Sequence, residues 1–393
     1  KNIRKATLLV SVVMNLSLLG IFKYGSFFIG SVNGIFGSAI PDPGLPLPIG
    51  ISFFTFQSMS YTIDLYRRNI KVQKNFIDFA AFVTMFPQIV AGPIVRYEDV
   101  SAQLACRRID LRSMSDGITR FVCGMCKKVL IANSIGALWT DVKAQDYASM
   151  PAATAWLGIA AFTLQIYFDF SGYSDMAIGL GKMLGFDFPE NFRYPYNSKS
   201  IAEFWRRWHI TLGDWFKSYV YFPLGGSRGS TAATIRNTLI VWLLTGLWHG
   251  ASWNFILWGL YYGVLIILEK FVFRRLLERT PSALRHILTM LAVVFGWVIF
   301  EITSPASELE FVKAMLGFGG SFANSFTINA LHNYAVTFIA AIAISTGIPL
   351  KICKKLPEKR ADTLSLVGEA AGMTACIACL VDSGYNPFLY FNF

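Results

Sequence analysis

Two apolar runs meet at a single histidine in the stretch "RNTLIVWLLTGLWHGASWNFILWGLYYGVLIILEK", Arg236 to Lys270. Both ends of this stretch are basic, and 33 residues lie between them. As α-helix these residues would extend about 50 Å. Two full crossings of a bilayer core need about 60 Å. If both basic ends face the cytoplasm, we expect the chain to turn inside the bilayer, at His249.

The composition of the whole chain indicates a membrane protein. Of the 393 residues, 54% are hydrophobic and only 15% are charged, and the mean hydropathy is +0.47. Soluble domains carry about 25% charged residues. The net charge of +11 could indicate a nucleic-acid partner, but Lys and Arg gather in short segments between apolar runs. That distribution is typical of cytoplasmic loops, so no nucleic-acid binding is predicted.

The sequence predicts an all-α polytopic fold without a strand pattern. Runs that reach or approach the ~20 residues of a spanning helix are Ala6 to Phe22, Leu47 to Tyr66, Phe79 to Val95, Ala152 to Leu180, Ile235 to Trp248, Ser252 to Leu268, Leu284 to Phe300, Leu331 to Leu350 and Leu364 to Val381. The third run contains Pro87 and Gly92-Pro93, which should break its helix. Broken segments at membrane depth need protein or water to cover the freed backbone, so we expect a cavity.

The charges of the loops predict an orientation. Segments rich in Lys and Arg should face the cytoplasm, and these are Arg67 to Lys74, Arg107 to Lys128, Lys270 to Arg285 and Lys351 to Arg360. Asp141 to Pro151 and Glu301 to Asn329 are acidic or nearly neutral and are expected outside, as is the tail from Tyr385 to Phe393. We interpret residues 1–393 as one integral-membrane domain. Because it begins at Lys1 rather than Met, close to an apolar run, we expect residues to precede it.

A second Trp-His pair lies in "EFWRRWHITLGDWF", Glu203 to Phe216. Taken as one continuous helix, this stretch places His209 on an aromatic face with Trp205, Trp208, Leu212, Trp215 and Tyr219. The opposite face carries Glu203, Arg206, Arg207, Asp214 and Lys217. An ionisable group within a membrane segment is costly without a partner or a wet cavity, so His209 and His249 are candidates for chemistry. Packing through interhelical hydrogen bonds is the alternative; His286 and His332 are expected at the surface.

Polar residues also interrupt the apolar helix predicted at "LQIYFDFSGYSDMAIGLG", Leu164 to Gly181. Asp169, Ser171 and Tyr173 are candidate substrate-binding residues, and a packed polar cluster is the alternative. The glycines of this segment should let neighbouring backbones approach closely; they are Gly172, Gly179 and Gly181. The two Cys-x-x-Cys pairs lie in apolar segments without a supporting histidine pattern, so no metal site is predicted.

Six motifs, in this order, resemble the membrane-bound O-acyltransferase family, most closely its bacterial alginate and peptidoglycan O-acetyltransferase branch. They are "LPIGISFFTFQSMSYTIDLYR" (47–67), "FPQIVAGPIVRYED" (86–99), "YFDFSGYSDMAIGLGKMLGF" (167–186), "NFRYPYNSKSIAEFWRRWHITLGDWFKSYVYFPLGG" (191–226), "GLWHGASWNFILWG" (246–259) and "YNPFLYFNF" (385–393). The resemblance covers nearly the whole chain.

This resemblance implies a fold of broken or re-entrant helices around a central tunnel in the bacterial cytoplasmic membrane. It places His249 in the catalytic position and makes His209 the second characteristic histidine. It also implies a cytoplasmic acyl thioester donor such as acetyl-CoA, a hydroxyl acceptor, and an extracytoplasmic SGNH-hydrolase-type partner that completes polysaccharide O-acetylation. No bound cofactor is expected.

The residues support this chemistry independently. Transfer from a thioester to a hydroxyl needs a base that works near neutrality, a role that suits His249. His209 or Asn254 could stabilise the developing oxyanion, and Trp248 and Asn254 are candidate substrate-binding residues. The basic side chains of the second Trp-His stretch could attract the phosphates of the donor or, alternatively, lipid headgroups; these are Arg206, Arg207 and Lys217.

Two other functions remain open at this point. A D-alanyl transferase of the same family would take its acyl group from a carrier protein and modify teichoic acid. A transporter could also use polar residues and broken helices near the midplane, although no internal repeat is visible.

Overall fold

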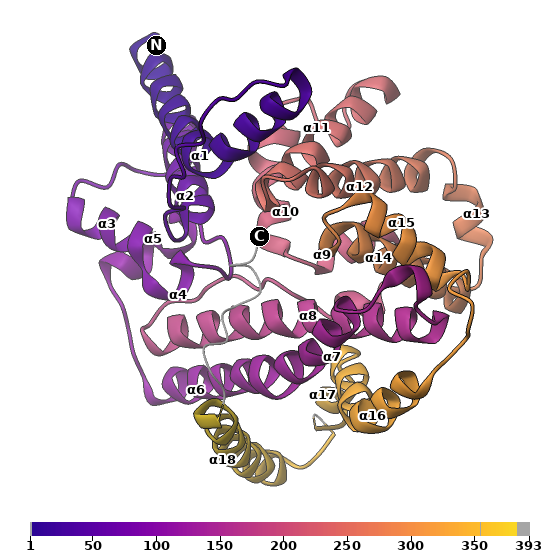
Figure 1. The fold of residues 1–393 in the computed structure, drawn as a ribbon. Helices are drawn as coiled ribbons and strands as arrows, with labels where there is room; N and C mark the ends of the chain where they lie inside the picture. The colour runs from indigo at the N-terminus through magenta and orange to yellow at the C-terminus, as the bar shows by residue number, and fades with distance from the viewer. Residues whose placement is uncertain (1, 354, 383–393) are drawn as a thin grey trace.

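The computed structural model describes residues 2–353 and 355–382, and every regular element in those ranges is helical (Figure 1). In chain order the α-helices are α1 Asn2–Phe36, α2 Ile51–Arg67, α3 Phe76–Thr84, α4 Phe86–Ile89, α5 Tyr97–Ala105, α6 Leu111–Cys126, α7 Asn133–Lys143, α8 Ala152–Met183, α9 Ile201–Arg207, α10 Ile210–Phe216, α11 Thr231–His249, α12 Trp253–Phe271, α13 Arg274–Arg279, α14 Ser282–Glu301, α15 Pro305–Met315, α16 Ser325–Ser345, α17 Ile348–Cys353 and α18 Glu358–Asp382. Two π-helical segments, η1 Lys127–Ala132 and η4 Lys217–Tyr221, and two 3-10 turns, η2 Tyr147–Ser149 and η3 Pro195–Asn197, complete the set. The all-α prediction is confirmed.

Six helices are long and apolar enough to cross a membrane, counted over the described ranges. They are Asn2–Phe36, Leu111–Lys143, Trp253–Phe271, Ser282–Glu301, Ser325–Ser345 and Lys359–Val381. Eight of the nine apolar runs noted in the sequence fall largely within helices. The other, residues 79–95, is broken as predicted: α3 ends at Thr84, α4 at Ile89, and Gly92 then takes a φ of 104°. The predicted external tail from Tyr385 to Phe393 lies outside the described residues.

The prediction that Arg107 to Lys128 forms a cytoplasmic loop is wrong from Leu111 onward. That residue begins α6, which continues through η1 and α7 as one 33-residue candidate span. Lys127 and Lys128 lie at the π-helical turn and pair with Asp175 and Asp169 of α8, respectively. Their charges are therefore satisfied inside the protein and do not mark a solvated loop. The partner carboxylates lie more than 40 residues further along the sequence, beyond the reach of a reading based on local charge.

Helix α6 packs antiparallel against the C-terminal half of α8, and α18 lies on the outer side of α6 (Figure 1). Glycines permit the close approach of α6 and α8. A Cβ atom at Gly124 would lie 2.5 Å from the carbonyl oxygen of Gly172, and one at Gly179 would lie 2.6 Å from that of Gly117. The expected role of Gly172 and Gly179 is confirmed, whereas Gly181 makes room for the ring of Phe188.

We expect Gly124→Ala to destabilise the protein by about 1–3 kcal/mol, because the new methyl group forces α6 away from α8. The matched control is Gly20→Ala in α1, where an added Cβ meets nothing within 4 Å. Alanine favours a helix over glycine by about 1 kcal/mol, so the control should be neutral or stabilising. Thermal unfolding in detergent measures both changes. Equal melting temperatures for the two variants would contradict the packing argument.

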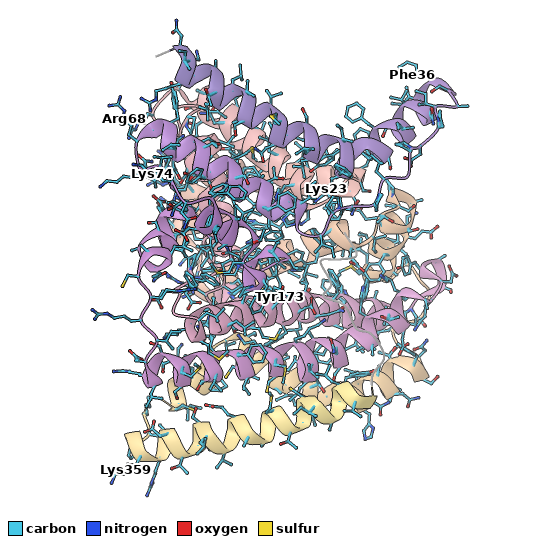
Figure 2. The ribbon with its side chains drawn as sticks, turned by 90° about the vertical axis from the view of Figure 1, so that its left-hand side faces the viewer. Lys23, Phe36, Arg68, Lys74, Tyr173 and Lys359 are labelled. Carbon is cyan, nitrogen blue, oxygen red and sulfur yellow. The ribbon has the colours of Figure 1, made fainter. Side chains whose placement is uncertain are left out.

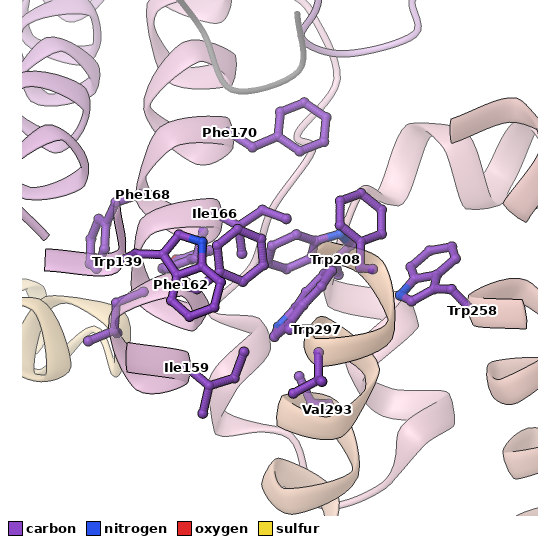
Figure 3. Packing of buried hydrophobic residues seen from close by; sticks show 14 of the residues in the cluster. Trp139, Ile159, Phe162, Ile166, Phe168, Phe170, Trp208, Trp258, Val293 and Trp297 are labelled. Atoms are coloured by element: carbon purple, nitrogen blue, oxygen red, sulfur yellow. The ribbon is translucent and has the colours of Figure 1, made fainter. Parts of the chain in front are cut away.

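Aromatic residues fill the centre of the molecule. Trp208, which follows α9, packs against Trp297 of α14 with ring centroids 4.8 Å apart (Figure 3). The ring centroid of Trp258 of α12 lies 6.5 Å from that of Trp297, and all three side chains are buried. This core joins α8, α9, α12 and α14 around the end of α11. Helices α1 and α18 lie at opposite edges of the molecule (Figure 2).

Helices α11 and α12 form the hairpin that carries His249 at its tip. Each has 19 residues, which is about 28 Å of helix, against a hydrocarbon core of ~30 Å. The two helices touch at Gly246 and Gly259, where a Cβ atom would lie 2.3 Å from Phe255 O and 2.4 Å from Trp242 O, respectively. The depth of His249 in the bilayer stays a prediction.

Candidate active site

His249 is the last residue of α11, and its side chain is 5% exposed. Rings of Trp248, Trp258 and Phe300 surround it, with centroids 5.1, 4.9 and 5.6 Å from that of the imidazole. Gly250 follows in extended conformation, and a Cβ there would lie 2.1 Å from the ring of Phe255, so the tight turn requires glycine. The Nε2 atom of His249 is buried and has no hydrogen-bond partner among the described residues. An unpartnered polar atom in such a place is available for a substrate.

His209 lies at a break between two short helices, so the prediction of one continuous helix over Glu203 to Phe216 is wrong. Helix α9 ends at Arg207, α10 begins at Ile210, and His209 adopts left-handed backbone angles, φ 43° and ψ 53°. Non-glycine residues rarely adopt this conformation, which often marks a functional site. The predicted division of faces nevertheless holds. Trp208, His209, Leu212, Trp215 and Tyr219 are buried, while Arg206, Asp214 and Lys217 are exposed.

Asn191 fixes the orientation of the His209 ring. The Nδ2 atom of Asn191 donates to Ser174 Oγ at 3.1 Å and to Gly92 O at 3.4 Å. Its Oδ1 therefore faces His209 Nδ1, 3.0 Å away, and also accepts from Thr211 Oγ1. Since Oδ1 is an acceptor, Nδ1 of His209 carries the proton, and a neutral ring leaves Nε2 as an acceptor. This Nε2 is buried without a partner among the described residues.

The rings of His209, His249 and Trp248 lie at the corners of a triangle. The ring centroids of the two histidines are 6.4 Å apart, and that of Trp248 lies 5.8 Å from His209 and 5.1 Å from His249. Trp248 also contacts Phe53 and Phe56 of α2. The structure thus brings together the two Trp-His pairs, which are 40 residues apart in the sequence. Both imidazoles present an unpartnered Nε2, an arrangement that can hold and move a proton.

The other predicted polar residues are distributed differently. Asn254 is buried near His249 and donates from Nδ2 to Phe300 O at 2.8 Å, while its Oδ1 has no partner among the described residues. Asp169 lines a cavity and pairs with Lys128. Ser171 and Tyr173 do not line that cavity. Ser171 points about 200° around the helix from Asp169, whereas Tyr173 lies one turn further along α8, beside Gly92. Their predicted contact with substrate stays untested.

The basic residues of α9 and η4 lie as the sequence predicted, at the molecular surface. Arg206 and Lys217 are exposed, and Arg207 donates to Glu203 at 2.7 Å and to the carbonyl of Arg193 at 3.2 Å. A donor-binding role for them stays a prediction.

Among the remaining histidines, His332 is exposed as expected. His286 is half-buried, with its Nδ1 2.9 Å from Ser198 O, so it lies at the surface only in part.

A large cavity of about 1160 Å³ opens beside the turn that follows His249. Ala251 and Ser252 of this turn form part of its wall, together with Phe255 and Phe300, and Phe300 contacts the His249 ring. The other lining residues include Lys23, Lys128, Trp139, Lys143, Asp146, Tyr147, Gln165, Asp169, Glu301, Ser304 and Glu310. Several of these residues belong to Asp141 to Pro151 and Glu301 to Asn329, the two segments predicted to lie outside. Mixed polar and aromatic walls suit a hydroxylated ligand.

A small cavity of about 450 Å³ lies among residues of the predicted cytoplasmic side. Arg67 and Arg96 line it, and each guanidinium lies 5.4 Å from the ring centroid of Tyr219. Asp64 accepts a hydrogen bond from Tyr219 in the same wall. Arg96 and the cavity residue Lys23 were not predicted as functional from the sequence, and Tyr219 was predicted only as part of the aromatic face of the His209 stretch. Lys23 could have been noticed in the sequence, because Lys23-Tyr24 interrupts an apolar stretch that continues to Phe36.

The sulfurs of Cys126 in α6 and Cys376 in α18 lie 3.8 Å apart. No group of three or more possible metal ligands occurs within residues 2–353 and 355–382.

The model of the membrane-bound O-acyltransferase family matches residues 51–307, which include both histidines, the cavity residue Asp169 and the α11–α12 hairpin. The chain belongs to this family. Together with six candidate spans, the match makes it a multi-pass membrane protein.

Curated relatives of this membrane-bound O-acyltransferase come from the branch that the motifs indicated. The protein named "Probable alginate O-acetylase AlgI" of Pseudomonas aeruginosa is 46% identical over 316 residues, which cover 79% of this chain and 60% of that protein. The peptidoglycan O-acetyltransferase of Helicobacter pylori is 35% identical over 347 residues, 81% of this chain and 66% of that protein. The teichoic acid D-alanyltransferase of Bacillus subtilis is 28% identical over 278 residues, 64% and 68% of the two chains. The chain thus spans about three fifths of the length of its alginate O-acetylase relatives.

Substitutions of His209 can separate a supporting role in the reaction from a role in folding. We expect His209→Ala to lower the transfer rate by about 10²-fold, because losing a group that orients a reacting hydroxyl costs about that much. His209→Asn and His209→Gln should recover part of the loss, since both keep a hydrogen-bonding group and asparagine tolerates left-handed backbone angles. Initial rates and melting temperatures of the purified variants measure the two effects. If His209→Gln loses as much activity as His249→Ala, the two roles must be reassigned.

Proposed function

We propose that this chain is an O-acetyltransferase of the bacterial cytoplasmic membrane. It takes the acetyl group from a thioester donor, acetyl-CoA, on the cytoplasmic side and delivers it to a hydroxyl on the outer side for polysaccharide O-acetylation. An extracytoplasmic partner of the SGNH-hydrolase type completes the transfer. The observation that carries this proposal is the pair of buried imidazoles, each with an unpartnered Nε2, beside a large polar and aromatic cavity.

In this proposal His249 is the general base. Its Nε2 accepts the proton of the acceptor hydroxyl as the hydroxyl oxygen attacks the carbonyl carbon of the thioester. When the tetrahedral intermediate collapses, the C–S bond breaks, and the leaving sulfur takes the proton from the imidazolium to give a free thiol. His209, with its ring held by Asn191 and its proton on Nδ1, offers Nε2 as a hydrogen-bond acceptor, which orients the acceptor hydroxyl for the attack. Asn254 and Trp248 complete the wall around the reacting carbon.

Donor and acceptor would approach from opposite sides. The phosphates of acetyl-CoA suit Arg67 and Arg96, which line the small cavity, and the basic residues of α9 and η4, which are Arg206, Arg207 and Lys217. The acceptor hydroxyl suits the large cavity, where Trp139 and Tyr147 offer apolar ring faces and Asp169 and Glu301 accept hydrogen bonds. The named relatives support an acetylated polysaccharide as the final product, because two of them carry alginate or peptidoglycan O-acetylation in their names.

The experiment that tests this proposal compares donors. Purified protein in lipid nanodiscs is given either acetyl-CoA or a D-alanyl carrier protein, each with a labelled acyl group, and a hydroxylated acceptor. We expect free thiol and labelled ester from acetyl-CoA only. Transfer from the D-alanyl carrier alone would favour the teichoic acid alternative, which the more distant D-alanyltransferase relative represents. No transfer from either donor, with the protein folded and the partner present, would contradict acyltransferase activity.

A further inference from the structure

Helix α1 carries a lysine into the interior, at the end of the helix that bears His249. The Nζ atom of Lys23 donates to Trp248 O at 2.6 Å, to Ser52 Oγ at 3.1 Å and to His249 O at 3.4 Å. Figure 2 labels Lys23 part-way along α1, with Phe36 beyond it at the helix end. This contact joins residues 225 and 226 positions apart in the sequence.

The next residue extends the same contact. The hydroxyl of Tyr24 donates to Leu247 O at 2.5 Å. Lys23 and Tyr24 therefore bind three consecutive carbonyls of the last turn of α11, those of Leu247, Trp248 and His249. The last four carbonyls of any helix lack partners within the helix, and they carry its partial negative charge. A lysine and a phenol from α1 supply the donors that a C-terminal cap normally provides.

Lys23 is unusual among the lysines and arginines that reach into this fold. Arg120, Lys127 and Lys128 each form ion pairs with carboxylates of α8 or the loop after it. No ion pair to a carboxylate is formed by Lys23 within the described ranges, and its partners are the carbonyls, Ser52 and the ring of Trp248, 5.8 Å away. Placing a basic side chain in a membrane segment costs free energy. A lysine that is nevertheless held by the carbonyls at the end of α11 therefore indicates a function at that helix end.

We propose that Lys23 and Tyr24 are positioning residues that fix the turn carrying His249. This inference rests on the proposed function, in which His249 is the base. The chain leaves α11 through Gly250, which has no side chain to hold the turn, and the cavity opens directly after it. The donors from α1 hold the last turn of α11, and hence the His249 ring, in place. Misplacement of a catalytic group by about 1 Å can cost 10²-fold in rate.

Steady-state kinetics of four variants test this proposal. We expect Lys23→Met to lower kcat by about 10²-fold with little change in KM for donor or acceptor, because a positioning residue does not bind either. Lys23→Arg should recover part of kcat, and Tyr24→Phe should lower kcat less than Lys23→Met does. The matched control is Ser11→Ala, which removes a hydrogen bond from α1 to Thr62 of α2 and leaves the end of α11 untouched. Its kcat should stay near that of the wild type.

A second readout does not depend on catalysis. Hydrogen exchange of peptides covering residues 247–252 should be faster in Lys23→Met than in the wild type, and unchanged in Ser11→Ala and His249→Ala, because loss of a cap opens a helix end locally. If His249→Ala remains active, the proposed base is wrong, yet exchange still decides whether α1 holds the turn.

Three results would overturn the positioning role. The first is unchanged kcat and unchanged exchange in Lys23→Met. The second is a raised KM for the acceptor with unchanged kcat, which would make Lys23 a binding residue of the cavity. The third is a parallel fall of activity and melting temperature that Lys23→Arg does not relieve, which would indicate general packing.

Discussion

Replacing His249 should abolish acetyl transfer while leaving the protein folded. The expected fall is about 10²–10⁴-fold, the contribution of a general base. Nε2 of His249 has no hydrogen-bond partner among the described residues. Removing this atom therefore breaks no hydrogen bond to a described residue. His249→Ala removes ring contacts with Trp248, Trp258 and Phe300, whereas His249→Phe keeps an aromatic ring in this place. Both variants should be inactive, and the Phe variant should melt close to the wild type.

The measurement pairs initial rates of thiol release with melting temperatures in the same detergent. His332→Ala serves as the control, because that histidine is exposed and lies outside the site. Retained transfer in His249→Phe would remove His249 from the chemistry. If activity of both variants fell only in proportion to stability, His249 would be a packing residue.

Much of the fold follows from local sequence. Apolar runs of helical length predict most of the spans, and Pro87 and Gly92-Pro93 predict the break between α3 and α5. Glycines at 172 and 179 predict close packing, and the structure shows the neighbour, α6. These features could be predicted because each depends on chain stiffness, side-chain size or hydropathy within a single segment.

The errors arise where a distant segment overrides the local pattern. The helical period continues without interruption through His209, so nothing in Glu203 to Phe216 indicates the left-handed residue that splits it. Asn191 and Thr211 hold that conformation through hydrogen bonds that only the folded chain provides. Lys127 and Lys128 likewise resemble loop residues until the carboxylates of α8 are placed beside them. Tertiary context of this kind cannot be predicted from one sequence.

The candidate site shows the same division. Both Trp-His pairs were predicted from the cost of placing an imidazole in a membrane segment. Their approach to 6.4 Å depends on how α9, α10 and α11 meet, which hydropathy does not specify. The cavity and the contact of Lys23 with α11 depend on long-range packing as well.

The second large effect that we expect is a strict dependence on sidedness. The large cavity is lined by residues of the loops around Asp146 and Ser304, which carry little positive charge, and the small cavity is lined by Arg67 and Arg96 on the basic side. The turn that bears His249 lies next to the large cavity. These positions favour a donor from the cytoplasm and an acceptor from outside that meet near His249.

Sealed vesicles of known orientation test this arrangement. Acetyl-CoA is too highly charged to cross a bilayer unaided. Labelled acetyl-CoA enclosed on the cytoplasmic side should therefore acetylate a hydroxyl acceptor, or a purified partner protein, supplied only on the opposite face. Vesicles that contain His249→Phe should transfer no label, and vesicles made leaky with detergent should lose the dependence on side. Label that appears only when donor and acceptor share one face would refute transfer across the membrane, and His249 would then serve a one-sided site.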